Sequence, residues 1–151
     1  MARRRLVHRE PCFVCGPVGG PQPPQGVQVA FVWDDDSKIL EAQCQFGSEC
    51  QGPPGYAHGG AVFAVVDEAL GGACWMSGLP VLTGKITIQY RKPVPLHQPC
   101  RVEGFVVHIA GRKVTARGQL FGPDGLCAEA EGLFIQQDRL EWNVDLAEIV
   151  G

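Results

Sequence analysis

GGAVFAVVDEALGGACWM, residues 59–76, is the stretch that decides the fold of this 151-residue chain. Apolar side chains occur on every side of the helix that it predicts, a pattern typical of a helix enclosed by other elements. Asp67 and Glu68 and four glycines interrupt the apolar run. The stretch therefore suits a buried helix better than a bilayer span, and we expect no membrane segment.

Strand-like segments lie on both sides of this helix. β-Branched and alternating apolar residues predict two strands before it and four after it, joined by turns rich in Gly, Pro and Asp. The expected strands are 27–33, 39–46, 82–90, 100–109, 113–120 and 126–136. The economical packing of these elements is an α+β domain, with an antiparallel sheet of five to six strands wrapped round one long central helix.

The two ends of the chain differ from this central part. Residues 1–26 are rich in Pro, Gly and Arg, so we expect an N-terminal arm without regular structure. Residues 27–137 form the expected single domain. Residues 138–151 are a C-terminal tail, and their apolar residues suggest a short helix there.

Composition limits the function classes. A net charge of -3 gives no chain-wide basic field, so nucleic acid is not expected as a partner. The basic N-terminus is not followed by the apolar region of a secretory signal, and seven cysteines, an odd number, fit a reducing compartment. We therefore expect a cytoplasmic location.

The start of the central helix is a candidate site. Helix starts expose unpaired backbone amides and the positive end of the helix dipole, which together bind developing negative charge. Gly59 and Gly60 carry no side chain there, so a substrate carbonyl can come close enough for these amides to form an oxyanion hole. The alternative is that the two glycines merely ease a tight entry into the helix.

Asp67 and Glu68 are the charged residues of the apolar helix, and a buried carboxylate is costly unless it is partnered. Neighbouring helical residues diverge by about 100°, so one of the two should serve a structural role or be exposed. Asp67 lies roughly 13 Å along the helix axis from His58, too far for both to act on one carbonyl. If they cooperate, they should come from opposite subunits of a two-fold dimer.

Several motifs together resemble the phenylacetate-degradation type of hotdog acyl-CoA thioesterases. They are QGPPGYAHGGA at residues 51–61, VVDE at 65–68, TGKITIQYRKP at 83–93 and AEAEGLF at 128–134. The resemblance implies the hotdog fold and an acyl-CoA substrate hydrolysed without a cofactor. It also implies a homodimer, with a tetramer as a further assembly.

The resemblance further implies roles for particular residues. The Gly59 amide would polarise the thioester carbonyl, and His58 would help to shape the helix start. Asp67 of the neighbouring subunit would act as general base or as nucleophile, with Thr83 orienting the water or the carboxylate. Gln51 matches a loop amide that contacts the thioester. The alternative function is a non-catalytic acyl-CoA-binding or structural hotdog domain.

Two weaker signals remain. Arg91, Lys92 and Lys113 stand near strand ends, where they would contact the phosphates of CoA, although a solvated basic face is the alternative. Cys12 and Cys15 have the spacing of half a zinc site, but the sequence contains no second such pair. We therefore interpret the pair as a reduced turn and expect no metal.

Overall fold

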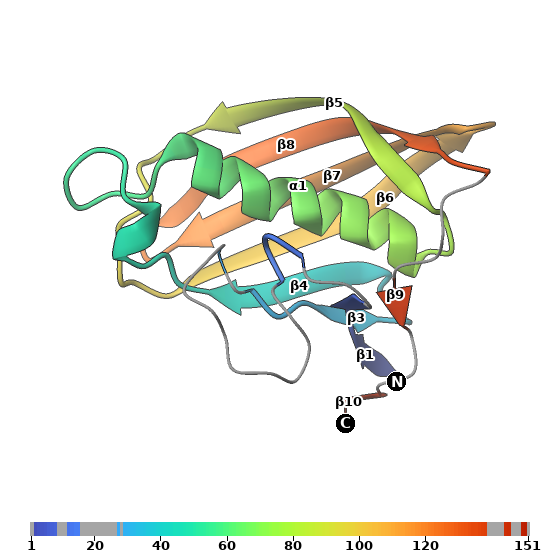
Figure 1. The fold of residues 1–151 in the computed structure, drawn as a ribbon, viewed down its shortest axis with the longest axis horizontal. Coiled ribbons are helices and arrows are strands. Elements are labelled where there is room, and N and C mark those ends of the chain that lie inside the picture. The colour runs from blue at the N-terminus through green and yellow to red at the C-terminus, as the bar shows by residue number, and fades with distance from the viewer. Residues whose placement is uncertain are drawn as a thin grey trace.

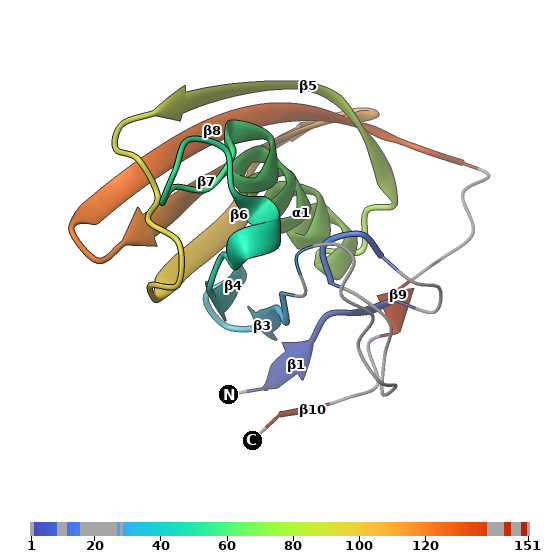
Figure 2. The same ribbon diagram turned by 60° about the vertical axis from the view of Figure 1, so that its left-hand side comes forward.

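The fold was analysed in a computed structural model, which describes residues 2–8, 12–15, 27, 29–138, 144–145 and 149–150. One long helix, α1 (Gly59–Met76), lies across a large antiparallel sheet, and the sheet curls round it (Figures 1 and 2). The strands are β1 (Arg3–Arg5), β3 (Val32–Asp34), β4 (Ile39–Cys44), β5 (Val81–Tyr90), β6 (Cys100–Ala110), β7 (Lys113–Gly122), β8 (Gly125–Gln136) and β10 (Ile149–Val150). This is the predicted hotdog arrangement, but among the described residues the sheet has eight strands rather than the expected five to six, because β1 and β10 extend it beside β3.

The strand order across the sheet is β10-β1-β3-β4-β6-β7-β8-β5. All neighbouring strands run antiparallel. The ten residues of β5, which follow the helix directly, therefore form one edge of the sheet. A second small sheet pairs β2 (Val7–His8) with β9 (Val144–Asp145).

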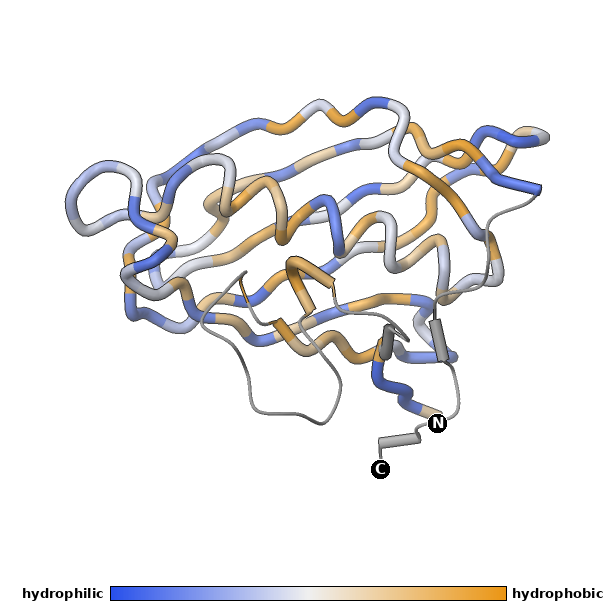
Figure 3. The backbone as a smooth tube through the Cα atoms, in the orientation of Figure 1, coloured by the Kyte–Doolittle hydropathy of each residue, from blue (hydrophilic) through white to orange (hydrophobic). Residues whose placement is uncertain are grey.

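Helix α1 begins and ends where its sequence provides caps. The ring nitrogen of His58 accepts a hydrogen bond at the first turn, and Gly78, with φ +86°, follows the last residues in the left-handed conformation that commonly ends helices. Figure 3 shows a mainly apolar helix with one hydrophilic turn near its middle, where the sequence places Asp67 and Glu68. Its buried residues form the core together with the large side chains Phe31, Trp33, Phe46 and Phe134.

The helix lies closest to the sheet over two opposed glycines of β6 and β7, Gly104 and Gly118. A Cβ atom on Gly104 would stand 2.3 Å from the carbonyl oxygen of Ala69, in the backbone of α1. On Gly118 a Cβ would stand 2.4 Å from Leu70 Cδ1. Only glycine allows so close an approach. This close contact fixes the depth at which α1, and hence Asp67, lies on the sheet.

The outer parts of the chain differ from expectation. The first predicted strand, 27–33, is shorter and begins at Val32. The prediction that residues 1–26 lack regular structure is wrong for Arg3–Arg5, which pair with β3 and β10, whereas the Pro-rich part at 17–24 lies outside the described residues. The described residues of the tail form short strands rather than a helix, although Leu140, Trp142 and Leu146 are not among them.

No helix in the described part of the chain has both the length and the apolar character needed to cross a membrane.

Candidate active site

The start of α1 is shaped by His58. Its Nδ1 atom accepts a hydrogen bond from the Gly60 amide at 2.9 Å, and its own amide donates to the Cys50 carbonyl at 2.7 Å. A Cβ atom on Gly52 would stand 2.8 Å from His58 Cα, so the preceding loop packs directly against this residue. His58 is therefore the N-cap of α1. Its role in a reaction stays a prediction.

The same bond changes the expectation for Gly60. Its amide is engaged by His58, so Gly60 could donate to a substrate only if that bond broke. The Gly59 amide, by contrast, has no acceptor among the residues that the structure describes. Gly59 is thus the open donor at the positive end of the helix dipole.

Tyr90, at the end of β5, contacts this helix start from the other side. Its hydroxyl donates to the Gly59 carbonyl at 2.8 Å, and its ring atoms lie 3.6 Å from where a Gly59 Cβ would be. Tyr90 is half exposed, and burial of its remaining part raises the pKa of its phenol. The motif at residues 83–93 did not predict this contact.

Asp67 and Thr83 are in direct contact. The Thr83 hydroxyl donates to Asp67 Oδ1 at 2.9 Å, beside an irregularity in the pairing of β5 with β8 between Thr83 and Lys85. Burial raises the pKa of the Asp67 carboxyl above its ordinary value; the Thr83 bond lowers it, while the charge of Glu68 raises it. A carboxylate whose pKa is raised in this way is a better proton acceptor than an exposed one.

A cavity of about 130 Å³ adjoins this carboxylate. Most of its wall is apolar, with Asp67, Glu68 and Thr83 as polar members. The arm contributes one wall residue, Leu6, that the sequence analysis did not associate with the site. The lining comprises Leu6, Asp67, Glu68, Gly71, Gly72, Trp75, Val81, Leu82, Thr83 and Phe134.

Glu68 points to a different partner, as the divergence of neighbouring helical residues predicted. Its Oε1 atom lies 3.2 Å from the Cys15 sulfur and 3.6 Å from the Cys12 sulfur, and both thiols are placed to donate to it. The hydrogen bond between Cys15 and Cys12, burial and the charge of Glu68 all raise the pKa of the Cys15 thiol. Both carboxylates line the cavity, but Asp67 binds Thr83 whereas Glu68 joins the helix to the Cys12–Cys15 turn.

The side chain of Gln51 stabilises its own loop. Its Oε1 atom accepts from the Gly55 amide at 3.0 Å, and its backbone bridges to Ala57 just before the helix. The predicted contact between the Gln51 amide and a thioester stays a prediction.

The basic residues predicted to contact CoA fall into two groups. Arg91 and Lys92 directly follow Tyr90 and so lie at the helix-start end of the sheet. Arg91 contacts Gln89 and forms an ion pair with Glu129 at 2.6 Å, while Lys92 donates to the Asp124 carbonyl at 2.7 Å. Lys113 pairs with Ile135, seven residues along β8 from the partner of Tyr90, hence roughly 24 Å away. Within one chain the three do not form one cluster.

The Gly59 amide and the Asp67 carboxylate also lie apart within one chain. Gly59 and Asp67 are eight residues apart on one helix, about 12 Å along its axis. No single carbonyl group can contact both within one chain.

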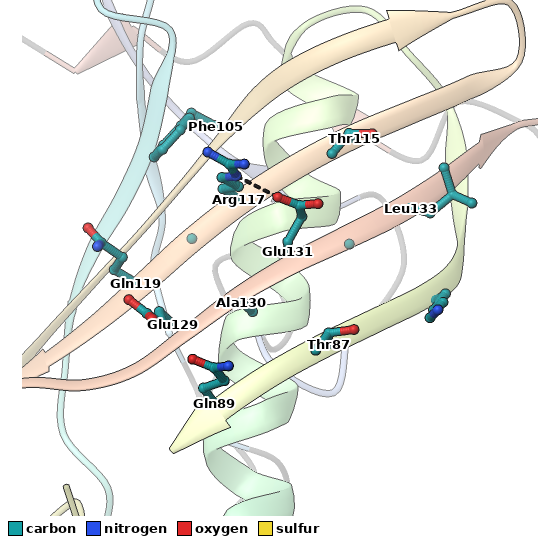
Figure 4. A pocket seen from close by; sticks show the side chains of 13 residues that line it. Thr87, Gln89, Phe105, Thr115, Arg117, Gln119, Glu129, Ala130, Glu131 and Leu133 are labelled. Carbon is teal, nitrogen blue, oxygen red and sulfur yellow. Dashed lines mark hydrogen bonds and ion pairs between the residues drawn. The ribbon is translucent and has the colours of Figure 1, made fainter. Parts of the chain in front are cut away.

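A larger hollow of about 810 Å³ lies on the face of the sheet away from α1 (Figure 4). The side chains standing over it are mostly polar, and Arg117 and Glu131 form an ion pair of 2.6 Å across β7 and β8. It contains neither Asp67 nor the helix start. We therefore do not regard it as the reaction site.

Comparisons with known proteins identify the family of the chain. Residues 54–129 match the thioesterase superfamily. The acyl-coenzyme A thioesterase THEM4 of Xenopus laevis is 37% identical over 114 residues, covering 74% of this chain and 51% of that protein. THEM4 of Rattus norvegicus is 31% identical over 115 residues, covering 75% and 50%. The chain thus spans about half the length of these curated relatives.

Solved structures share the fold. The crystal structure of a thioesterase superfamily protein superposes with a TM-score of 0.68 at 31% identity, covering 72% of this chain and 53% of that one. The PaaI protein of the Escherichia coli phenylacetic acid degradation operon superposes with a TM-score of 0.62 at 17% identity, covering 66% and 73%. At that lower identity the likeness concerns the fold alone.

Proposed function

Because the chain belongs to the thioesterase superfamily, we propose that it is an acyl-CoA thioesterase that hydrolyses a CoA thioester to the free acid and CoA. The observation that carries this proposal is the pair of half-sites on α1. An open backbone amide stands at Gly59, and a carboxylate with a raised pKa, held by Thr83, stands at Asp67.

The Gly59 amide is the proposed oxyanion-stabilising half of the site. As the thioester carbonyl is attacked, negative charge develops on its oxygen, and a fixed amide at a helix start stabilises that charge without reorganising. His58 and Tyr90 hold the surrounding turn, one through the Gly60 amide and the other through the Gly59 carbonyl. Both contacts keep the Gly59 amide directed outward.

Asp67 is the proposed basic half. Its carboxylate takes a proton from the attacking water, or itself attacks the carbonyl carbon; both routes end in release of the CoA thiol. Thr83 fixes one carboxylate oxygen and leaves the other to act. A protein that only bound a neutral thioester would have no need of a carboxylate beside it, which favours catalysis over a binding role.

The two halves meet in a dimer in this proposal. β5 is a ten-residue edge strand that exposes 54% of Leu82 and 51% of Tyr90. An exposed edge strand of this length can pair with another chain unless it is covered. A homodimer built edge to edge through β5, as the basic unit of any tetramer, would bring Gly59 of one subunit toward Asp67 of the other.

Arg91 and Lys92 are the proposed contacts for CoA, because they lie at the Gly59 end of the sheet. Lys113 would serve the same CoA only from the other subunit. The small apolar cavity beside Asp67 would receive the acyl group. The odd number of cysteines, seven, fits a reducing compartment, and we propose a cytoplasmic location.

Deleting the open amide tests the oxyanion-stabilising half of the site. Gly59→Pro removes this donor at the first helical position, where proline is tolerated, and His58 already has the extended conformation, with ψ 139°, that a following proline requires. Loss of one oxyanion donor costs on the order of 100-fold in kcat. Gly59→Ala keeps the amide, has room for its Cβ atom and should retain most activity. Equal activity of the two variants would refute the role of the amide.

Mixing variants tests the two-subunit site. Gly59→Pro and Asp67→Asn homodimers should each be nearly inactive on acyl-CoA. Random reassociation should restore about a quarter of the parental activity, since half of the dimers are mixed and each mixed dimer has one intact site. No recovery in confirmed mixed dimers would refute a reaction site shared between Gly59 of one subunit and Asp67 of the other. Near-parental turnover by folded, dimeric Asp67→Asn would leave an acyl-CoA-binding protein as the better description.

A further inference from the structure

The Cys12–Cys15 turn and Glu68 form a cluster outside the proposed reaction. The two sulfur atoms and a carboxylate oxygen of Glu68 all lie within 4.8 Å of one another, and the three side chains are half-buried. Two elements far apart in the sequence, the arm and helix α1, thus place their metal-binding atoms together. In the described residues it is the one group of three or more such side chains that is close enough to share a cation.

We propose that Cys12, Cys15 and Glu68 bind a borderline-soft divalent cation, with Zn²⁺ as the best match. Thiolates favour zinc over magnesium or calcium, and carboxylates commonly complete such sites. The sequence alone indicated a reduced turn, because it showed two ligands of a possible four. The structure supplies the third ligand, and one coordination position remains for water.

The distances fit tetrahedral coordination. With Zn–S near 2.3 Å and Zn–O near 2.0–2.2 Å, a tetrahedral site separates sulfur from oxygen by roughly 3.5 Å. The sulfur atoms of Cys12 and Cys15 lie 3.6 Å and 3.2 Å from Glu68 Oε1. Two edges of the tetrahedron are therefore in place before any metal binds. Binding would replace the two S–H bonds by two S–Zn bonds and release two protons, so the site needs no oxidant or reductant.

The turn is anchored well enough to hold such a site. Val14, between the two cysteines, is buried in the core, and the Phe13 and Val14 carbonyls accept hydrogen bonds from the Val27 and Val29 amides at 3.1 and 2.7 Å. Glu68 is fixed on the central helix. A cation here would join the arm to α1 beside the cavity, as a structural clamp distinct from the reaction itself.

Metal content is the direct test. The full chain is expressed with zinc, purified under reducing conditions without chelator, and its zinc is measured per chain. We expect about one zinc ion per chain in the parental protein and none in Cys12→Ser/Cys15→Ser. Glu68→Gln should retain thiol ligation but lose its zinc more readily to a competing chelator. The matched control is Cys44→Ser/Cys100→Ser, which removes a second pair of thiols, directly opposed on β4 and β6 but without a neighbouring carboxylate, and should keep its zinc.

Cobalt provides a measurement that does not depend on how well the variants fold. Titration of the reduced, metal-free parental protein with Co²⁺ should produce a thiolate-to-cobalt absorption band in the near ultraviolet. Added Zn²⁺ should abolish the band and raise the melting temperature. Absence of the band together with absence of bound zinc would overturn the proposal. Equal zinc in the parental protein and Cys12→Ser/Cys15→Ser would also overturn it, as would a Cys12–Cys15 disulfide in the reduced preparation.

Discussion

Replacing Gly104 by alanine tests the depth at which α1 lies on the sheet. The new Cβ atom would stand 2.3 Å from the Ala69 carbonyl oxygen and 2.6 Å from the Ala69 carbonyl carbon, whereas ordinary contacts begin near 3.4 Å. Both groups belong to backbone, so the helix and β6 must separate by about 1 Å. No rotation of a side chain can relieve this contact.

The expected cost follows from two opposing effects. Overpacking of this kind destabilises the folded protein by about 1–3 kcal/mol. Alanine also restricts the unfolded chain more than glycine does, which stabilises the variant by about 0.4–1 kcal/mol. We expect a net loss of about 1–2 kcal/mol, or roughly 2–8 °C in melting temperature. Asp67 lies two residues before Ala69, so the shift should also move it from Thr83 and lower kcat more than it changes KM.

Urea unfolding at a fixed protein concentration, combined with steady-state kinetics, measures both effects. The matched control is Gly71→Ala on the same helix, whose Cβ atom would lie 3.4 Å from the Phe134 ring and therefore fits. That variant should gain up to about 1 kcal/mol, since alanine favours the helix interior more than glycine does. A Gly104→Ala protein as stable and active as the parent would refute the idea that backbone contact at this glycine sets the helix position.

Three further substitutions address the proposed site. Thr83→Val removes the hydrogen bond that lowers the pKa of Asp67, so the pKa should rise further and the acidic limb of kcat/KM should move to higher pH, whereas Thr87→Val on the same strand should leave the pH profile unmoved. Tyr90→Phe removes one half-exposed hydrogen bond to the Gly59 carbonyl and should reduce kcat by about 2- to 12-fold; an unchanged kcat would show that this contact does not hold the helix start. Leu82→Glu places a charge on the exposed edge strand, so sedimentation should reveal weaker association, with activity falling in parallel. Full activity in a monomeric Leu82→Glu protein would contradict a shared site.

Much of the fold could be predicted because its signals are local. The enclosed helix was predicted at its observed bounds, since its apolar residues occur on every side and change abruptly to strand patterns at both ends. The predicted strands that follow it agree with β5–β8 to within two residues at each end, because alternation and glycine turns are equally local.

The remaining features depend on contacts between distant segments. The backbone contact of α1 with the sheet is at Gly104 of β6, and its position depends on how the sheet twists under α1. β1 pairs with β3 across the long connection between them. Three consecutive arginines have no periodicity that would predict such a strand. The Gly60 bond to His58 and the Tyr90 bond to Gly59 depend on side-chain orientation, which spacing alone does not determine.

The way in which the chain ends cover the sheet has a consequence for larger assemblies. β1 and β10 lie together at the margin opposite β5, and both are only two or three residues long. A sheet with two long free margins can add copies at either side without limit and so grow into a filament. This sheet offers a long free margin on one side among the strands that the structure describes. In the proposed dimer, self-recognition through β5 would therefore be satisfied after a single partner has docked, and growth would stop at a closed pair.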